Sequence, residues 1–274
     1  MEGGRSLAKT GKIRFAFVLL AATFIMLGTA LAAEGDRVDA RFEIYGFAGF
    51  HVLTNRTSVQ EIGERYAIAM DLDTRGLASV FVDLTSRSEV HGALARDTPH
   101  PDAYRADVRR NSVDRHYAVD YRRDGAVINA SASTAPPFSV SAEQIRGTVD
   151  QLTAYFILER QLARRSTCSL VVPVFDGSGY YNLRFTDIGR EALSPDRYQN
   201  FAGTSNVCQV AREDIVVNPD RNDDTYKQGR MWYAQVVAGD QMLPVRMGFD
   251  TAFGRVKGYL AELRGRGVTL QLLK

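Results

Sequence analysis

The sequence lacks the clusters of residues from which most metal sites are built. No HxxxH, HxH or CxxC motif occurs, which argues against a zinc site of ordinary ligand spacing. The segment that begins at Asp220 starts like a calcium loop, but Thr225 stands where that loop requires glycine and Met231 stands where it requires glutamate. We therefore expect no metal ligands. The four histidines are scattered along the chain: His51, His91, His100 and His116.

Sequence fingerprints of nucleotide-binding and hydrolytic enzymes are absent as well. There is no P-loop and no dinucleotide-binding glycine motif, and Gly177-Ser178-Gly179 lacks the GxSxG frame of a nucleophile elbow. We predict no cofactor, no catalytic residue and a protein that is not an enzyme. Linear sequence leaves one alternative open, which is an enzyme whose carboxylate pair is assembled only by the fold.

Lysine is scarce beyond residue 32, where it occurs only at Lys227, Lys257 and Lys274. The full chain has 34 basic and 32 acidic residues, but four of the basic residues and one of the acidic residues precede residue 33. The rest of the chain is therefore close to neutral. This balance gives no support to a nucleic-acid partner.

The first 32 residues have the order of a secretory signal peptide. Basic residues precede an apolar run from Phe15 to Leu27, and small residues follow it up to Ala33. We predict cleavage after Ala32, with Ala33 as the alternative, and therefore a periplasmic or otherwise exported protein of residues 33–274 that forms a single domain. The alternative is an uncleaved membrane anchor, because the segment from Phe15 to Ala33 is just long enough to span a bilayer.

The chain has two cysteines, Cys168 and Cys208. An exported chain meets an oxidising compartment, in which a pair of cysteines is normally bridged. We therefore predict a Cys168–Cys208 disulfide. By the chain-entropy estimate such a loop closure stabilises a fold by about 4 kcal/mol.

Alternation of apolar and polar residues is the main structural signal that the sequence contains. Tyr66, Ile68, Met70 and Leu72 fall on one face of an expected strand. The same period recurs near Phe42, Tyr104, Tyr117, Tyr181 and, along one face, at Leu243, Val245, Met247 and Phe249. Turn residues between these segments predict antiparallel hairpins. We expect a mainly β fold: a large, meandering, curved antiparallel sheet or half-barrel.

One helix is expected, over residues 150–165, packed across the sheet. Asp150 can cap its first amides, and Arg164 and Arg165 suit its C-terminal end. The run from Gly76 to Val82 is too short to distinguish a helical turn from a strand. Polar or proline-containing loops are expected at residues 135–138 and 219–224.

Three charged residues invite a functional interpretation. Asp176 precedes Gly177, a strong hairpin signal, so we interpret it as a turn residue rather than a catalytic acid. Asp150 is first a helix cap. Arg246 lies between apolar residues on the expected strand and should point to the opposite face, where an ion-paired arginine is the ordinary outcome; it is the one candidate for anchoring a ligand.

The stretch from Tyr104 to Arg123 is rich in arginine and tyrosine, a pattern that nucleic-acid-binding surfaces share. Interspersed aspartates neutralise much of its charge. We interpret it as the mixed-sign outer face of neighbouring strands, and an anionic ligand is the alternative.

Several motifs together resemble an exported bacterial family catalogued as domain of unknown function 3108. They are Gly147–Ala154, the segment from Cys168 through Pro173–Gly177 to Leu183, the later Cys208, Leu243–Arg246 and Thr251–Gly254. The resemblance implies export, a mostly antiparallel sheet and paired cysteines, and it implies no activity. More loosely, such a sheet with a helix across it is similar to the lipoprotein-carrier folds of the bacterial envelope.

These observations favour a non-enzymatic envelope protein that binds a lipid or another amphipathic envelope component between a curved sheet and the helix. A structural or interaction module of an envelope assembly, which pairs through a strand edge or a tyrosine-rich face, is the alternative.

Overall fold

The computed structural model describes residues 37–46, 49–76, 79, 83–96, 98–133, 140–216, 228–238, 241–251 and 254–273. The predicted signal peptide, with Ala32 and Ala33 at its cleavage site, lies outside these residues and stays a prediction. The loops expected at 135–138 and 219–224 and the calcium-like segment from Asp220 to Thr225 lie outside them too, as do most of Gly76–Val82 and the centre of the Thr251–Gly254 turn.

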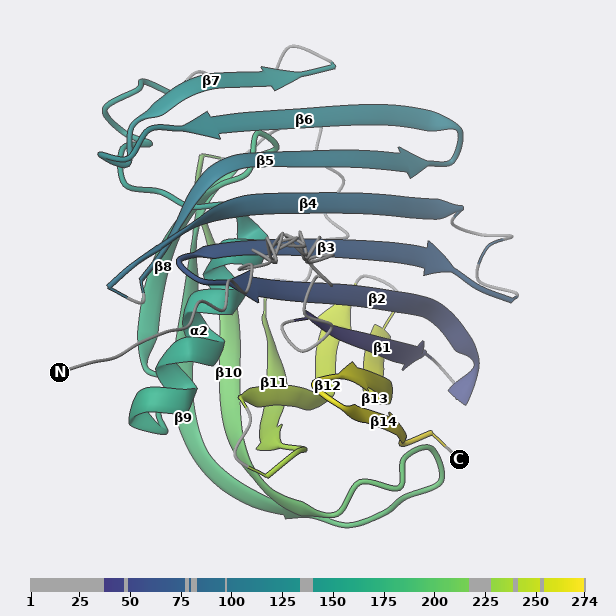
Figure 1. Cartoon of the computed structure of the whole chain (residues 1–274). Helices are drawn as coiled ribbons and strands as arrows, with labels where there is room; N and C mark the ends of the chain where they lie inside the picture. Colours follow the sequence, from purple (N-terminus) through teal and green to yellow (C-terminus); the bar gives the residue numbers. More distant parts are fainter. Residues whose placement is uncertain are drawn as a thin grey trace, which may run out of the picture. The chain divides into compact units, whose positions relative to one another are not determined.

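The described strands form a single antiparallel sheet of 14 strands that does not close on itself (Figure 1). Its order is β7-β6-β5-β4-β3-β2-β1-β13-β12-β11-β10-β9-β8, with β14 paired to β13. The strands are β1 Arg37–Tyr45, β2 His51–Ile62, β3 Arg65–Thr74, β4 Leu84–Ala95, β5 Thr98–Arg110, β6 Val113–Tyr121, β7 Val127–Ala132, β8 Leu170–Phe175, β9 Tyr180–Leu193, β10 Gly203–Val216, β11 Gln228–Gln235, β12 Met242–Thr251, β13 Gly254–Gly265 and β14 Val268–Gln271.

Two meanders make up this sheet. Strands β1 to β7 pair in chain order, and so do β8 to β13. Pairing of β1 with β13, in which Ile44 faces Gly258, joins the two meanders into one surface. In Figure 1, β2–β7 run across the view while β8–β10 run from top to bottom, so the sheet curves strongly around its interior.

The predicted alternation is confirmed in most strands. In β3, Tyr66 and Ile68 are buried while Arg65 and Ala67 are exposed. In β9, Tyr181, Leu183 and Phe185 are all fully or almost fully buried. Successive side chains of a strand point to opposite faces, so one face of each of these strands lies in the core and the other faces outward.

Strand β12 contains a bulge within its predicted apolar face. Its pairing with β11 shifts register, so that Trp232 faces Arg246 and Tyr233 faces Pro244 with Val245 left between them. Pro244 and Met247, three residues apart, consequently both line the interior. Leu243, Met247 and Phe249 line the interior as predicted and Val245 is fully buried, while the bulge adds Pro244 to the same lining.

Helix α2, Gln151–Arg165, begins and ends as predicted. Asp150 is its N-cap, with a side chain that accepts a hydrogen bond from the Thr153 amide, and Ser166 ends it in the left-handed conformation. Arg164 and Arg165 lie in its last turn. The helix packs against β4 and β5 of one meander and against β8 and β12 of the other. The predicted fold, an open curved antiparallel sheet with one principal helix across it, is confirmed.

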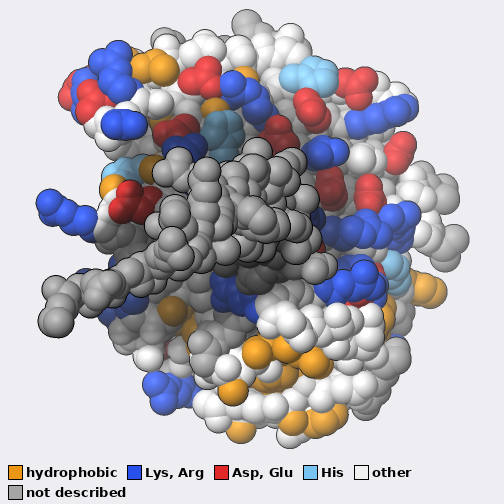
Figure 2. Space-filling model, in the orientation of Figure 1, with side chains coloured by type: hydrophobic (Ala, Val, Ile, Leu, Met, Phe, Trp, Pro, Cys, Tyr) orange, Lys and Arg blue, Asp and Glu red, His pale blue; other side chains and the backbone are white. Residues whose placement is uncertain are grey.

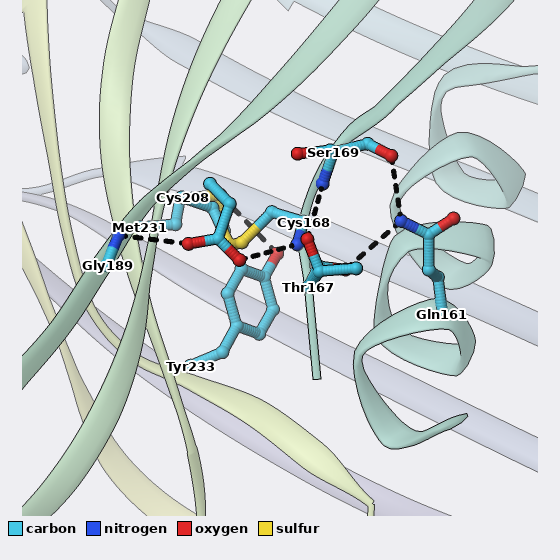
Figure 3. The surroundings of a disulfide bond; sticks show 9 residues. Gln161, Thr167, Cys168, Ser169, Gly189, Cys208, Met231 and Tyr233 are labelled. Atoms are coloured by element: carbon cyan, nitrogen blue, oxygen red, sulfur yellow. Dashed lines mark hydrogen bonds between the residues drawn. A yellow bond between two sulfur atoms is a disulfide. The ribbon is translucent and has the colours of Figure 1, made fainter. Parts of the chain in front are cut away.

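The predicted disulfide is present between β10 and the segment that precedes β8. Cys168 and Cys208 are bonded, with 5.7 Å between their Cα atoms, and both are fully buried. Figure 3 shows the bond beside Met231 and Tyr233, with Gln161 of α2 donating to the backbone carbonyls of Thr167 and Ser169. The bond thus ties the segment between helix α2 and strand β8 to the sheet.

Within the described residues, no helix is long and apolar enough to cross a membrane.

Candidate functional site: an apolar cavity beside helix α2

A cavity of about 370 Å³ lies between α2 and the concave face of the sheet. This volume falls at the lower end of the range of small-molecule sites, which is roughly 300–1,000 Å³. Its walls come from β1–β3, from α2 and from β11–β13 with the turn beyond β13. The apolar residues that line it include Phe42, Ile44, Leu53, Val59, Ile68, Met70, Leu72, Leu152, Tyr155, Phe156, Met231, Leu243, Met247 and Phe249.

The walls of the cavity come from both meanders because β1 pairs with β13. Every second residue of β2, namely Leu53, Asn55, Thr57 and Val59, points into it. Met247 and Phe249 of β12 form part of the opposite wall. Strands of both meanders therefore supply the lining, which is mostly apolar.

Two polar residues of the lining, Gln241 and Arg266, lie beside one acid, Glu61. Arg160 Nη1 donates to Glu61 Oε2 at 2.6 Å, and Gln241 Nε2 donates to Glu61 Oε1 at 2.7 Å. Arg266, in the turn between β13 and β14, brings Nη2 to 4.0 Å from Glu61 Oε1. Gln241 and Arg266 also line the cavity. Their contacts with Glu61 therefore form a polar region at one end of a mostly apolar cavity.

Glu159 is the one carboxylate among the described residues of the cavity lining. It is half-buried, and no hydrogen bond or ion pair of its side chain is found with any residue that the structure describes. Burial, reinforced by the nearby charge of Glu61, raises the pKa of Glu159 from 4.5 to about 8. The side chain is therefore mostly protonated at neutral pH and can donate a hydrogen bond.

This arrangement bears on the alternative of a fold-assembled carboxylate pair. Glu159 and Glu61 are neighbours, but Glu61 is ion-paired with Arg160. Glu61 is therefore ionised and paired, whereas Glu159 is protonated, so the two acids do not form a pair of free carboxylates. The expectation that the protein is not an enzyme stays a prediction.

Arg246, the ligand-anchoring candidate, is not among the described residues that line the cavity. Its Nη2 donates to Asp196 Oδ2 at 3.0 Å, and its guanidinium lies 5.5 Å from the ring centre of Tyr259. The ion pair corresponds to the ordinary outcome expected from its strand position, and a role in binding stays a prediction.

Asp176 and Asp150 both occupy structural positions. Asp176 Oδ1 accepts from the Ser178 and Gly179 amides, and its Oδ2 accepts from the Tyr181 hydroxyl at 2.7 Å, within the turn between β8 and β9. Asp150 accepts from the amide and the hydroxyl of Thr153. Complete burial raises the pKa of Asp150 to about 6 despite these bonds. Both contact patterns are those of a turn and a helix cap.

The arginine-rich stretch forms the outer face of β5 and β6. Arg105 donates to Asp120 at 2.6 Å across the two strands, and His116 pairs with Asp107. Figure 2 shows basic and acidic side chains interspersed over this part of the surface. The interpretation as a mixed-sign outer face agrees with these cross-strand pairs.

Sequence reasoning did not identify Glu61, Glu159, Gln241 or Arg266. A local signal existed for Glu159 alone, because it follows Leu152 and Phe156 at positions i+7 and i+3 and so continues the apolar stripe of α2 with a charge. For the others no signal exists, since they come together only when distant turns and strands meet.

Comparison with known proteins gives a family and no activity. The model of the family described as "Protein of unknown function (DUF3108)" matches residues 41–261. No curated protein matches the chain. A solved β-barrel-like protein of domain of unknown function DUF1849 from Brucella abortus is similar over 83% of this chain and 97% of its own, with 11% identity and a TM-score of 0.46. That likeness is too distant to carry an argument.

Proposed function

Since this chain belongs to the DUF3108 family, which brings no activity with it, we propose a function from the cavity alone. The protein is a non-enzymatic protein of the periplasm or cell envelope that binds a lipid or another amphipathic envelope component. The observation that supports this most directly is the cavity of about 370 Å³ between α2 and the concave sheet. A sheet whose own side chains filled that space would have left no room for a ligand.

The character of the lining favours an apolar chain as the occupant. Aliphatic, aromatic and methionine side chains form most of it, and burying an alkyl chain there gains roughly 25 cal/mol per Å² of apolar surface removed from water. Two polar residues of the lining, Gln241 and Arg266, lie beside Glu61 at one end of the cavity, and Asn55, Thr57 and Gln151 are the polar residues elsewhere in its walls. A molecule with a long apolar part and one polar end matches that distribution.

The experiment is to express the full chain with its own signal, purify it gently from the periplasm, and apply native mass spectrometry followed by organic extraction. We expect a co-purifying amphipathic molecule. The intact mass also tests cleavage after Ala32 or Ala33. A wild-type protein that carries no such molecule and binds no fluorescent fatty-acid probe would overturn the proposal.

A matched pair of variants makes this test specific to the cavity. Val59→Trp fills the cavity from β2, whereas Arg56→Trp puts the same side chain on the exposed, opposite face of the same strand. We expect the extracted molecule to be lost from Val59→Trp and retained by Arg56→Trp, with both variants folded by circular dichroism.

A second candidate is an interaction module that recruits a partner strand at the edge of the sheet. Strand β7 stands at one end of the described strand order, and its Ile128 is 55% exposed. An exposed edge strand is a template for pairing with another chain. Cross-linking from a photoreactive residue at position 128 to one envelope protein, with no small molecule bound, would favour this candidate.

A further inference from the structure

The charged groups of the polar region are already engaged with one another. Glu61 accepts hydrogen bonds from Arg160 and Gln241. Arg266 Nη2 lies 4.0 Å from Glu61 Oε1. Arg160 and Arg266 each interact with further groups of the protein as well. The protein itself thus provides partners for these charges, and no ion from a ligand is needed to neutralise them.

Glu159, next to Arg160 in α2, differs from these groups because its carboxyl has no partner. It lines the cavity, and no hydrogen bond or ion pair of its side chain is found within the described residues. Burial raises the pKa of this carboxyl to about 8, so it is mostly protonated at neutral pH. A protonated carboxyl has one O–H donor and retains an accepting oxygen. An unpaired polar group at an apolar wall costs free energy, which a hydrogen-bonding ligand would recover.

We propose that the occupant is an uncharged amphiphile, a single alkyl or acyl chain with a hydroxyl group at its polar end, and that this hydroxyl pairs with Glu159. This inference rests on the proposed function, because it assumes that an amphipathic molecule enters the cavity. A hydroxyl both donates and accepts hydrogen bonds, so it can satisfy the donor and the acceptor of the carboxyl together. The alkyl chain then lies along the apolar lining.

Charged head groups of either sign fit this end of the cavity less well. An anion would approach the carboxyl groups of Glu61 and Glu159. A cation would approach the guanidinium groups of Arg160 and Arg266, which lie beside the same acids. An ion also loses its hydration on entering an apolar cavity, which costs far more than burying a hydroxyl. A hydroxyl avoids the repulsion and has the smaller desolvation cost.

The uncharged polar residues of the walls lie elsewhere or pair with each other. Thr57 Oγ1 donates to Asn55 Oδ1 at 2.9 Å in β2. Gln151 lines the cavity from the first turn of α2, and eight residues separate it from Glu159, which corresponds to about 12 Å along the helix axis. Changes at Gln151 and at Glu159 can therefore distinguish two positions for a hydroxyl within one cavity.

The test measures the affinities of 1-dodecanol, dodecanoate, dodecylamine and 1-chlorododecane for the intact protein at neutral pH, by displacement of a fluorescent probe. The four ligands share one chain length, so differences among them report the head group. We expect 1-dodecanol to bind more tightly than either ion. Glu159→Leu should weaken 1-dodecanol about fivefold, which is the effect of one neutral hydrogen bond. It should not weaken 1-chlorododecane, because the chloride makes no such bond.

Two further variants complete the design. Glu159→Gln keeps a donor and an acceptor at this position and should retain most of the affinity for 1-dodecanol. Gln151→Leu makes a polar-to-apolar change in the same cavity and helix and should leave that affinity unchanged.

Three results would overturn the hydroxyl proposal while leaving the cavity a lipid site. They are tighter binding of dodecanoate or dodecylamine than of 1-dodecanol, equal changes of 1-dodecanol and 1-chlorododecane affinity in Glu159→Leu, and a loss of 1-dodecanol affinity in Gln151→Leu alone. Failure of all four ligands to bind would overturn both proposals.

Discussion

The two sides of helix α2 differ in how completely they are packed. On one side, Ala154, Leu158 and Leu162 lie against β8–β10 in a core that includes the disulfide, and all three are at most 1% exposed. On the other side, Tyr155 and Glu159 face the cavity toward β1–β3 and β11–β13. Helix α2 thus contributes residues to a close-packed core on one side and to the lining of an unfilled cavity on the other.

This difference indicates that the unfilled space is not a general looseness of the fold. Protein interiors are normally packed as densely as organic crystals, and the β8–β10 side follows that rule. Apolar residues line the other side as well, yet the helix there presents a carboxyl group at a position where leucine would continue its stripe. A carboxyl group in this position packs less favourably against apolar walls than leucine would, and its presence there supports the proposed binding function.

The largest effect is expected from removing the disulfide on the packed side. Replacing Cys168 and Cys208 together by alanine should lower the free energy of unfolding by about 4 kcal/mol, because the unfolded chain regains the entropy of an open loop. Urea denaturation of the variant and of the wild type measures this. If the cavity is independent of this core, probe binding under native conditions should stay unchanged; a parallel loss of binding would show that the two sides are one cooperative unit.

Leucine truncation compares the two sides directly. Leu183→Ala, in the β8–β10 core, should cost about 3 kcal/mol, since it leaves a new void in a close-packed region. Leu72→Ala, at the cavity wall, should cost about 1 kcal/mol, because the side chain is only partly buried and already borders empty space.

Denaturation midpoints at constant m-value give both numbers. Equal costs at the two positions would mean that the cavity wall is packed as tightly as the β8–β10 core.

The packed side was largely predictable from the sequence and the cavity was not. Period-2 alternation located Tyr181 and Leu183, the Asp150 cap located α2, and export implied the bond between Cys168 and Cys208. Each of these signals is local or depends on a pair of rare residues. A hairpin signal likewise predicted the turn at Asp176 and Gly177, which connects β8 and β9.

The pairing of β1 with β13 had no comparable signal, because it joins segments more than 200 residues apart and any edge strand could have served. The polar region depends on that pairing, since it brings the turn that carries Arg266 near Glu61. The register shift in β12 was equally invisible, because a bulge leaves no fixed pattern in the residues around Val245. The position of the candidate site therefore depends on pairing between strands that are far apart in the sequence, and local sequence propensity does not predict it.

The smallest expected effect is on the pH dependence of the free energy of unfolding. It distinguishes Glu159, which faces the cavity, from Asp150, which caps the helix. Glu159 has a pKa of about 8 in the folded protein and an ordinary value of 4.5 when unfolded. The folded state therefore binds its proton more tightly, and the stability gained from that proton is complete below about pH 4.5 and is lost as the pH rises through 8. Asp150, with a pKa of about 6, gives a similar loss at lower pH.

Glu159→Gln cannot ionise, so it should lose less stability than the wild type between about pH 6 and about pH 9, while both proteins share the Asp150 decline below that range. Urea denaturation of the two proteins across this range, without ligand, measures the difference. Parallel profiles would mean that Glu159 is already ionised and solvated at neutral pH. The cavity would then present a carboxylate to its occupant, and a cationic head group would become the better match.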